Sequence, residues 1–175
     1  MLIGLPSTSE LPKYYDRYIN LVFTDDLIGA LEEEMHDTIA MVLSASDELQ
    51  NYRYGEDKWN LKEILMHIVD GERIFAYRAL RFARMDSTML SGYEENDYVI
   101  ASKADNRTMQ SLIDEYEAVR LSTIQLFSNF TRDMLNQVGN ANGVEISVRA
   151  LGFTILGHEM HHKKVFEERY VNSFK

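Results

Sequence analysis

Residues 147–170 read SVRALGFTILGHEMHHKKVFEERY, and their apolar residues and histidines recur at the spacing of a helix. Ser147 is a good N-cap for a helix that starts at the next residue. Steps of four, three, four and three residues place one set of side chains on a single face: Leu151, Ile155, His158, His162 and Val165. Because this face should point into the protein, the segment predicts a long helix that buries two histidines.

Three more segments carry apolar residues at three- and four-residue spacing: residues 25–50, 60–84 and 108–130. The second begins with Asn60 and has Glu63 three residues later, which is the pattern of a capping box. The two prolines, Pro6 and Pro12, both precede these segments, so no proline interrupts the helices. Four long amphipathic helices must bury their apolar faces against one another, which predicts an all-α four-helix bundle.

The length of 175 residues fits one domain, and the chain shows no internal repeat or boundary. We therefore expect residues 1–175 to form a single domain, with residues 1–23 as an arm packed on the outside of the bundle. The link over residues 86–107 is long enough to cross the end of the bundle. The dipeptide Asn142-Gly143 is typical of the turn in a small hairpin.

The composition excludes several classes of function. Lys and Arg number 18 and Asp and Glu 28, so the formal net charge of −10 would repel nucleic acid. The chain has no cysteine, which excludes a thiol nucleophile, a disulfide and a cysteine-ligated zinc site. The sequence shows no signal-peptide pattern and no apolar run near the ~20 residues of a membrane span. We expect a cytoplasmic protein without nucleic-acid or membrane partners.

Three of the five histidines are placed to bind one metal ion. His158 and His162 lie one helical turn apart, and His67 lies on the inward face of the second helix. Gly71, one turn from His67, would leave open space. Three imidazoles leave a fourth metal position for water or substrate, which is typical of catalytic sites. Zinc, nickel, iron and manganese all accept imidazole donors.

The spacing alone leaves other assignments open. Each of these histidines could instead be a buried residue that is hydrogen-bonded to a neighbour and binds no metal. His161 could replace His162, because i,i+3 spacing also places it near His158. His36 has charged neighbours and is expected to face solvent.

The segment from His158 to His162 also fits the H-E-x-x-H pattern of zinc proteases, in which the glutamate is the general base. Such proteases take a third ligand further along the chain, but no histidine follows His162. A helical bundle also lacks an edge strand on which a peptide could align. We therefore expect Glu159 to act as a base for a metal-bound water or as a partner of a metal ligand.

Six stretches carry a resemblance to a known family: residues 15–22 (YDRYINLV), 58–84 (KWNLKEILMHIVDGERIFAYRALRFAR), 92–96 (GYEEN), 145–151 (EISVRAL), 157–162 (GHEMHH) and 168–170 (ERY). Together they resemble the DinB-like superfamily over nearly the whole chain. This superfamily includes YfiT-like metal-dependent hydrolases and thiol S-transferases. The resemblance implies a four-helix bundle in up-down-down-up order, often dimeric, with metal ligands at His67, His158 and His162.

The resemblance does not decide the reaction. In the thiol S-transferases, bacillithiol, mycothiol or glutathione would bring the nucleophile, so the absence of cysteine is no obstacle. In a hydrolase the same metal position would hold hydroxide. We expect a homodimeric S-transferase that uses zinc or nickel, a small-molecule thiol and an electrophilic substrate. The alternatives are a metal-dependent hydrolase and a non-catalytic, metal-stabilised dimerisation module.

Two further groups of residues have both a structural and a functional interpretation. Arg78, Arg81 and Arg84 form a basic stripe that could meet the carboxylates of a small thiol. Such a stripe is more often a solvated or interhelical face, here opposite the acidic residues 32–34. Trp59 and Tyr93 could line the mouth of a pocket or could pack at helix ends.

Overall fold

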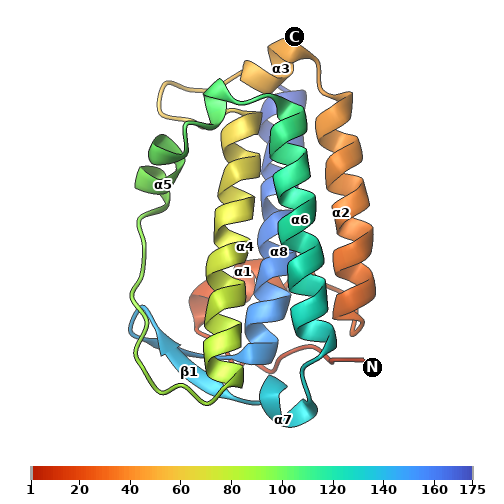
Figure 1. Cartoon of the computed structure of the whole chain (residues 1–175). Coiled ribbons are helices and arrows are strands. Elements are labelled where there is room, and N and C mark those ends of the chain that lie inside the picture. Colours follow the sequence, from red (N-terminus) through yellow and green to blue (C-terminus); the bar gives the residue numbers. More distant parts are fainter. Residues whose placement is uncertain (1, 175) are drawn as a thin grey trace.

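Four long helices lie side by side along the length of the molecule (Figure 1). The computed structural model describes residues 2–174. The bundle consists of α2 (Leu27–Ser44), α4 (Leu61–Ala83), α6 (Met109–Ser128) and α8 (Val148–Phe166). Shorter elements lie at its ends and sides: η1 (Lys13–Tyr15), α1 (Asp16–Ile19), α3 (Asp47–Asn51), α5 (Glu95–Ser102), η2 (Ala104–Asn106), α7 (Arg132–Leu135), β1 (Val138–Ala141), β2 (Val144–Ser147) and η3 (Glu167–Val171).

The helices run in up-down-down-up order, which confirms the expected fold. The colours of Figure 1 show that α2 and α8 run in one direction and α4 and α6 in the other. Because α4 and α6 are parallel, the chain between them must return along the bundle. The 23 residues of α4 are about 34 Å long at 1.5 Å per residue. Residues 84–108 cover this length along the side of the bundle, so the prediction that the link crosses the bundle end was wrong.

Local capping explains where the bundle helices begin. Asn60 accepts a hydrogen bond from the backbone N–H of Glu63, and the Glu63 carboxylate accepts one from the N–H of Asn60, which confirms the capping box. Ser147 caps α8 by accepting from the N–H of Ala150. These side chains satisfy backbone donors that the first helical turn leaves without partners.

The first predicted helix, over residues 25–50, is divided into two. The long helix α2 ends at Ser44, and Ala45 adopts an extended conformation. Ser46 then accepts a hydrogen bond from the N–H of Leu49 and starts the short helix α3. A serine in this position therefore caps a new helix, and the apolar periodicity alone did not reveal the break.

The core consists of two apolar clusters with a polar layer between them. One cluster contains Leu31 and Leu151, and the other contains Leu65 and Leu112. Buried polar side chains occupy intermediate positions on all four helices: Thr38, His67, Glu72, Arg120, His158 and Glu159. These buried polar side chains place the candidate site inside the bundle. As a separate finding, no helix within residues 2–174 is long and apolar enough to cross a membrane.

The N-terminal segment packs on the side of α8, and the hairpin lies at one end of the bundle (Figure 1). Helix α1 packs on α8, and the backbone of Tyr18 lies so close to Gly157 that no Cβ would fit there. Strands β1 and β2 pair antiparallel, and Asn142 and Gly143 both have positive φ in the predicted turn. Leu90, in the link from α4, bridges to Ala141 of this hairpin. These contacts bring three separate segments together around α8.

Candidate metal centre

Two neighbouring helices bring three histidines together. His67 lies on α4, and His158 and His162 lie one turn apart on α8. Each offers one ring nitrogen, and these three atoms all lie within 4.8 Å of one another. The Nε2 atoms of His67 and His158 are 3.0 Å apart. The structure thus gathers the three histidines that the sequence singled out.

This donor set fits a divalent transition metal. Burial lowers the pKa of His67 to about 4. Burial, and after it the charge of neighbouring histidines, holds the pKa values of His158 and His162 well below their usual range. The imidazoles are therefore neutral, which is the form that binds metal. Two nitrogens bound tetrahedrally to one zinc lie about 3.3 Å apart, close to the 3.0 Å between the Nε2 atoms of His67 and His158.

Aromatic rings surround the cluster. The ring of Trp59 lies 4.7 Å from that of His67, and the ring of Tyr18 lies 5.2 Å from that of His158, measured between centroids. The His158 ring also fills the space beside Gly71, where a Cβ would lie 3.2 Å from its Cε1 atom. The open space expected at Gly71 is therefore occupied by the imidazole itself. With the surrounding helices, these rings bury His67 and His158.

The other two histidines lie outside the cluster. His161 is half-buried, packs on Tyr18 with ring centroids 5.5 Å apart, and is not one of the three gathered donors. His36 is exposed on α2, as expected. The geometry therefore favours His162 over His161 as the third donor.

Glu159 belongs to a buried ionic network. Its Oε1 atom accepts hydrogen bonds from Thr38 and Tyr116, and its Oε2 atom pairs with Arg120. Arg120 also pairs with Glu72, with 2.7 Å between the charged atoms. Both carboxylate oxygens of Glu159 are thus engaged by α2 and α6. A role as a general base stays a prediction, and these contacts favour a structural role instead.

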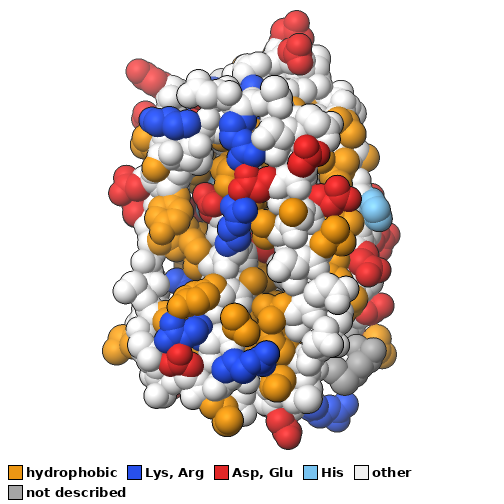
Figure 2. Space-filling model, in the orientation of Figure 1, with side chains coloured by type: hydrophobic (Ala, Val, Ile, Leu, Met, Phe, Trp, Pro, Cys, Tyr) orange, Lys and Arg blue, Asp and Glu red, His pale blue; other side chains and the backbone are white. Residues whose placement is uncertain are grey.

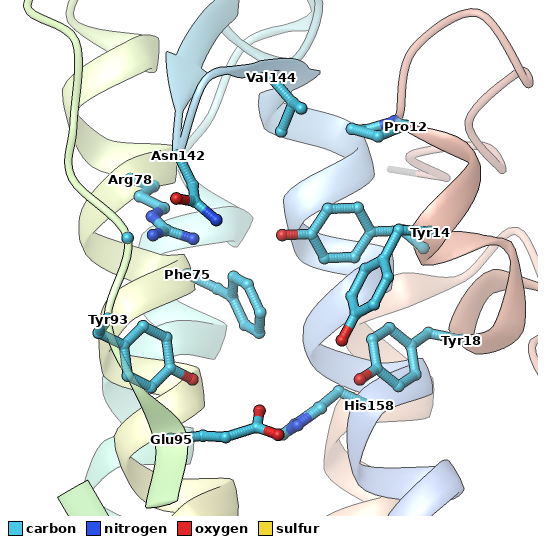
Figure 3. A pocket seen from close by; sticks show the side chains of 12 residues that line it. Pro12, Tyr14, Tyr18, Phe75, Arg78, Tyr93, Glu95, Asn142, Val144 and His158 are labelled. Atoms are coloured by element: carbon cyan, nitrogen blue, oxygen red, sulfur yellow. The ribbon is translucent and has the colours of Figure 1, made fainter. Parts of the chain in front are cut away.

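A cavity of about 330 Å³ opens beside His158 (Figure 3). Its walls come from the N-terminal segment, α4, the 84–94 link, α5 and the hairpin: Pro12, Tyr14, Tyr15, Tyr18, Phe75, Arg78, Gly92, Tyr93, Glu95, Asn142, Val144 and His158. Its size is at the lower end of the range for small-molecule sites. The cavity gives an outside molecule access to the side of the cluster at His158.

A second cavity, of about 250 Å³, reaches the cluster from the other side. His162 and Trp59 line it, together with His161 and Asn96. Asn96 is the neighbour of Glu95, which lines the first cavity, so the start of α5 stands between the two openings. Trp59 and Tyr93 therefore both line cavities, in agreement with one of the two interpretations of their sequence positions.

The predicted basic stripe does not form one face. Arg78 turns into the first cavity, whereas Arg81 pairs with Asp86 at the surface and Arg84 is exposed. Figure 2 shows basic side chains scattered among acidic and apolar ones on the α4–α6 face. Within the acidic stretch, Glu34 pairs with Lys163 at 2.7 Å. The expectation that the stripe opposes residues 32–34 was wrong.

Sequence reasoning missed Glu95. Among the described residues, it is the one carboxylate side chain that lines the first cavity, and Figure 3 shows it at the same end as His158. It lies in the link between α4 and α6, where no helical periodicity indicates which side chains face inward. The GYEEN motif at residues 92–96 was the available signal, because a polar motif within a long link often has a function.

Comparison with known proteins gives three findings. A model of the DinB superfamily matches residues 30–165. A protein of Oceanobacillus iheyensis named "Putative metal-dependent hydrolase" is 27% identical over 124 residues, which are 69% of this chain and 70% of that protein. The structure of YfiT from Bacillus subtilis, described as "a probable metal-dependent hydrolase with an unusual four-helix bundle topology", is similar with a TM-score of 0.77 and 13% identity. That match covers 97% of this chain and 93% of YfiT, and it shows a shared fold.

Proposed function

The chain belongs to the DinB superfamily, and on this basis we propose that it is a metal-dependent enzyme whose metal is held by His67, His158 and His162. The observation that carries this proposal is the convergence of three neutral imidazoles at the end of a cavity. Zinc and nickel are the proposed metals, because imidazole suits both. The name of the Oceanobacillus relative supports metal dependence.

We propose thiol S-transfer as the reaction. When bound, a divalent metal supplies a positive charge that lowers the pKa of a thiol or water molecule beside it. The two cavities support a reaction of two substrates, because one reaches His158 and the other His162. A small thiol such as bacillithiol, mycothiol or glutathione would enter one cavity and an electrophile the other.

Glu95 is the residue we propose to receive the thiol proton, because its carboxylate lies in the cavity at the His158 end. The thiol sulfur then attacks the electrophilic carbon, a C–S bond forms, and the leaving group departs with its electron pair. Tyr18 and Tyr93 line the same cavity. Their hydroxyls point into the cavity (Figure 3), and their rings would exclude water from the reacting atoms.

Hydrolysis is the second candidate, and the names of the relatives favour it. In that case a water molecule is the nucleophile, Glu95 takes its proton, and the cavity beside His158 holds the substrate. The same residues therefore serve both reactions. The two differ in what is consumed, since only S-transfer removes free thiol.

Elemental analysis of the untagged protein, purified without added metal, tests the metal site. About one equivalent of zinc or nickel per chain is the expected result. A preparation that is metal-free and does not take up zinc on titration would contradict the proposal, and the histidines would then serve packing alone.

The reaction is tested by incubating the metal-loaded protein with glutathione and monobromobimane and measuring free thiol. We expect thiol loss above the uncatalysed rate, abolished by a chelator and restored by the metal. Thiol loss that is independent of metal would contradict S-transfer. Hydrolysis of a panel of ester and amide substrates, without thiol loss, would instead support the second candidate.

The proposed assembly is a homodimer in the cytoplasm. Analytical ultracentrifugation measures the oligomeric state, and we expect a mass near twice the 20.3 kDa of the chain. A monomer at micromolar concentration would contradict it. Fractionation of the source cells tests the location.

A further inference from the structure

Arg78 and Arg120 are both buried arginines, but their partners differ. Arg120 is 0% exposed and pairs with both Glu72 and Glu159. Arg78 is 5% exposed, and within residues 2–174 it forms no ion pair. Its Nη2 atom donates one hydrogen bond, to the carbonyl oxygen of Ser91 at 3.0 Å. Arg78 thus carries a positive charge that no carboxylate of the described chain neutralises.

The guanidinium of Arg78 is held so that it faces the first cavity. Figure 3 shows it beside Asn142, at the end of the cavity opposite His158. Ser91 lies in the 84–94 link, and two hydrogen bonds, Leu90 N–H to Asn140 and Asn142 N–H to Leu90, attach this link to the hairpin. The acceptor for Arg78 is therefore fixed by the tertiary structure. The guanidinium also interacts with the Tyr15 hydroxyl, and its Cζ atom lies 5.9 Å from the centroid of the Phe75 ring, so its described neighbours in the cavity include no carboxylate partner.

The charges that face this cavity are separated along its length. Arg78 lies at one end and Glu95 at the other, beside His158 (Figure 3). Tyr15 and Tyr93 also line the cavity, and burial raises the pKa of Tyr93 to about 12 and raises that of Tyr15. These hydroxyls are therefore neutral at physiological pH. The end of the cavity at Arg78 is positive and can donate hydrogen bonds.

Burial of a cation without a partner opposes folding unless an anion from outside neutralises it. A guanidinium binds a carboxylate through two parallel N–H···O hydrogen bonds, a geometry that suits a planar anion. Arg78 lies seven residues after Gly71, beside which the His158 ring packs. Seven residues correspond to about 10 Å along the axis of α4. Helical side chains lean towards the N-terminus, so the Arg78 side chain leans along α4 in the direction of Gly71.

We propose that Arg78 binds the carboxylate of a small substrate whose reacting atom lies beside His158 at the other end of the same cavity. The position of the reacting atom rests on the proposed function, whereas the carboxylate site rests on Arg78 alone. The substrate class is a small acid whose carboxylate and reacting atom are less than about 10 Å apart. Asn142, beside Arg78, is placed to donate a further hydrogen bond from its amide.

Binding of 3-phenylpropionate, compared with that of its uncharged amide, tests the proposal. The phenyl ring suits the tyrosine-lined walls, and the two probes differ only in the group that Arg78 would recognise. Titration calorimetry on the wild-type protein should show the acid binding at least tenfold more tightly than the amide. Equal affinities, or no binding of the acid at millimolar concentration, would overturn the proposal without any variant.

Variants test whether Arg78 is responsible for the preference for the acid over the amide. Arg78→Gln should weaken binding of the acid at least tenfold and leave binding of the amide within about twofold. Arg84→Gln is the matched control, because it makes the same change on an exposed residue of the same helix and should leave both affinities unchanged. Unchanged binding of the acid to a folded Arg78→Gln variant would overturn the proposal. If that variant does not fold, Arg78→Lys, which keeps a donor for Ser91, replaces it.

Metal-free and metal-loaded protein separate this inference from the proposed function. If the acid binds chelator-treated protein through Arg78, the inference holds even where the protein proves unable to take up metal. If the acid binds only the metal-loaded protein, and Arg78→Gln makes no difference, the inference fails and the metal site stands. If glutathione displaces the bound acid, the carboxylate that Arg78 recognises belongs to the thiol. If the acid stays bound in the presence of glutathione, that carboxylate belongs to the second substrate.

Discussion

His67 and His158 are 91 residues apart in the sequence, and their Nε2 atoms are 3.0 Å apart in the structure. One lies on α4 and the other on α8, the pair of helices that makes the most extensive contact in the bundle. His162, one turn further along α8, completes the cluster. The inward faces of these two amphipathic helices therefore pack together and bring three donor atoms close to one another.

Alanine at the clustered histidines should remove the metal. His67→Ala or His162→Ala leaves two donors, so the metal content should fall from about one equivalent to less than a tenth. His36→Ala is the control, because His36 is exposed on α2 and should keep the wild-type content. Mass spectrometry of the purified variants measures this. Equal loss from all three variants would refute the assignment of ligands.

Two glutamates should respond differently to the same change. Glu159→Gln removes a charge that Arg120 pairs with, so the free energy of unfolding should fall by about 1–3 kcal/mol while the metal content is kept. Glu95→Gln changes an exposed residue of the cavity, so stability should stay within about 0.5 kcal/mol. The turnover of the Glu95→Gln variant should fall about 10²- to 10⁴-fold. Urea unfolding and thiol-consumption assays measure the two effects. The reverse pattern would restore Glu159 as the base.

Gly157→Ala should loosen the N-terminal segment. A Cβ at this position would overlap the backbone of Tyr18, which cannot move as a side chain could. Overpacking of this kind costs about 1–3 kcal/mol, so the thermal midpoint should fall by several degrees. Residues 13–23 should also become more sensitive to proteolysis. Gly55→Ala is the control, because there the nearest atom is the flexible Lys58 side chain at 3.2 Å.

The docking of the N-terminal segment should weaken in acid. Burial raises the pKa of Glu10, but hydrogen bonds from Ser7 and Ser147 and the charge of Arg149 outweigh it, so the net pKa is lowered. A lowered pKa means that Glu10 contributes stability above its unfolded pKa of about 4.3, and that this is lost as the pH falls through the folded value. The stability difference between the wild type and Glu10→Gln should therefore be largest near neutral pH and shrink below about pH 4. A difference that grows in acid would contradict this.

Much of the fold follows from local rules that act along the chain. The apolar periodicity of residues 60–84 and 147–170, with the caps at Asn60 and Ser147, predicted two helices that the structure contains. Periodicity could not show the break at Ala45, because one extended residue interrupts α2 without changing the apolar pattern. The link over residues 86–107 was predicted as a connection, but its path depends on the relative direction of α4 and α6.

The candidate site divides in the same way. The helical repeat of about 3.6 residues determined that His158 and His162 share a face and that His67 points inward, because the period of a helix is a local property. Only the tertiary structure decided that Glu159 joins Arg120 in a buried network and that Arg78 turns into a cavity, away from Arg81 and Arg84. It also brought Glu95 and Tyr93 to the cavity beside His158 from a link without periodicity. Those outcomes depend on which segments pack together, and packing is settled between distant parts of the chain.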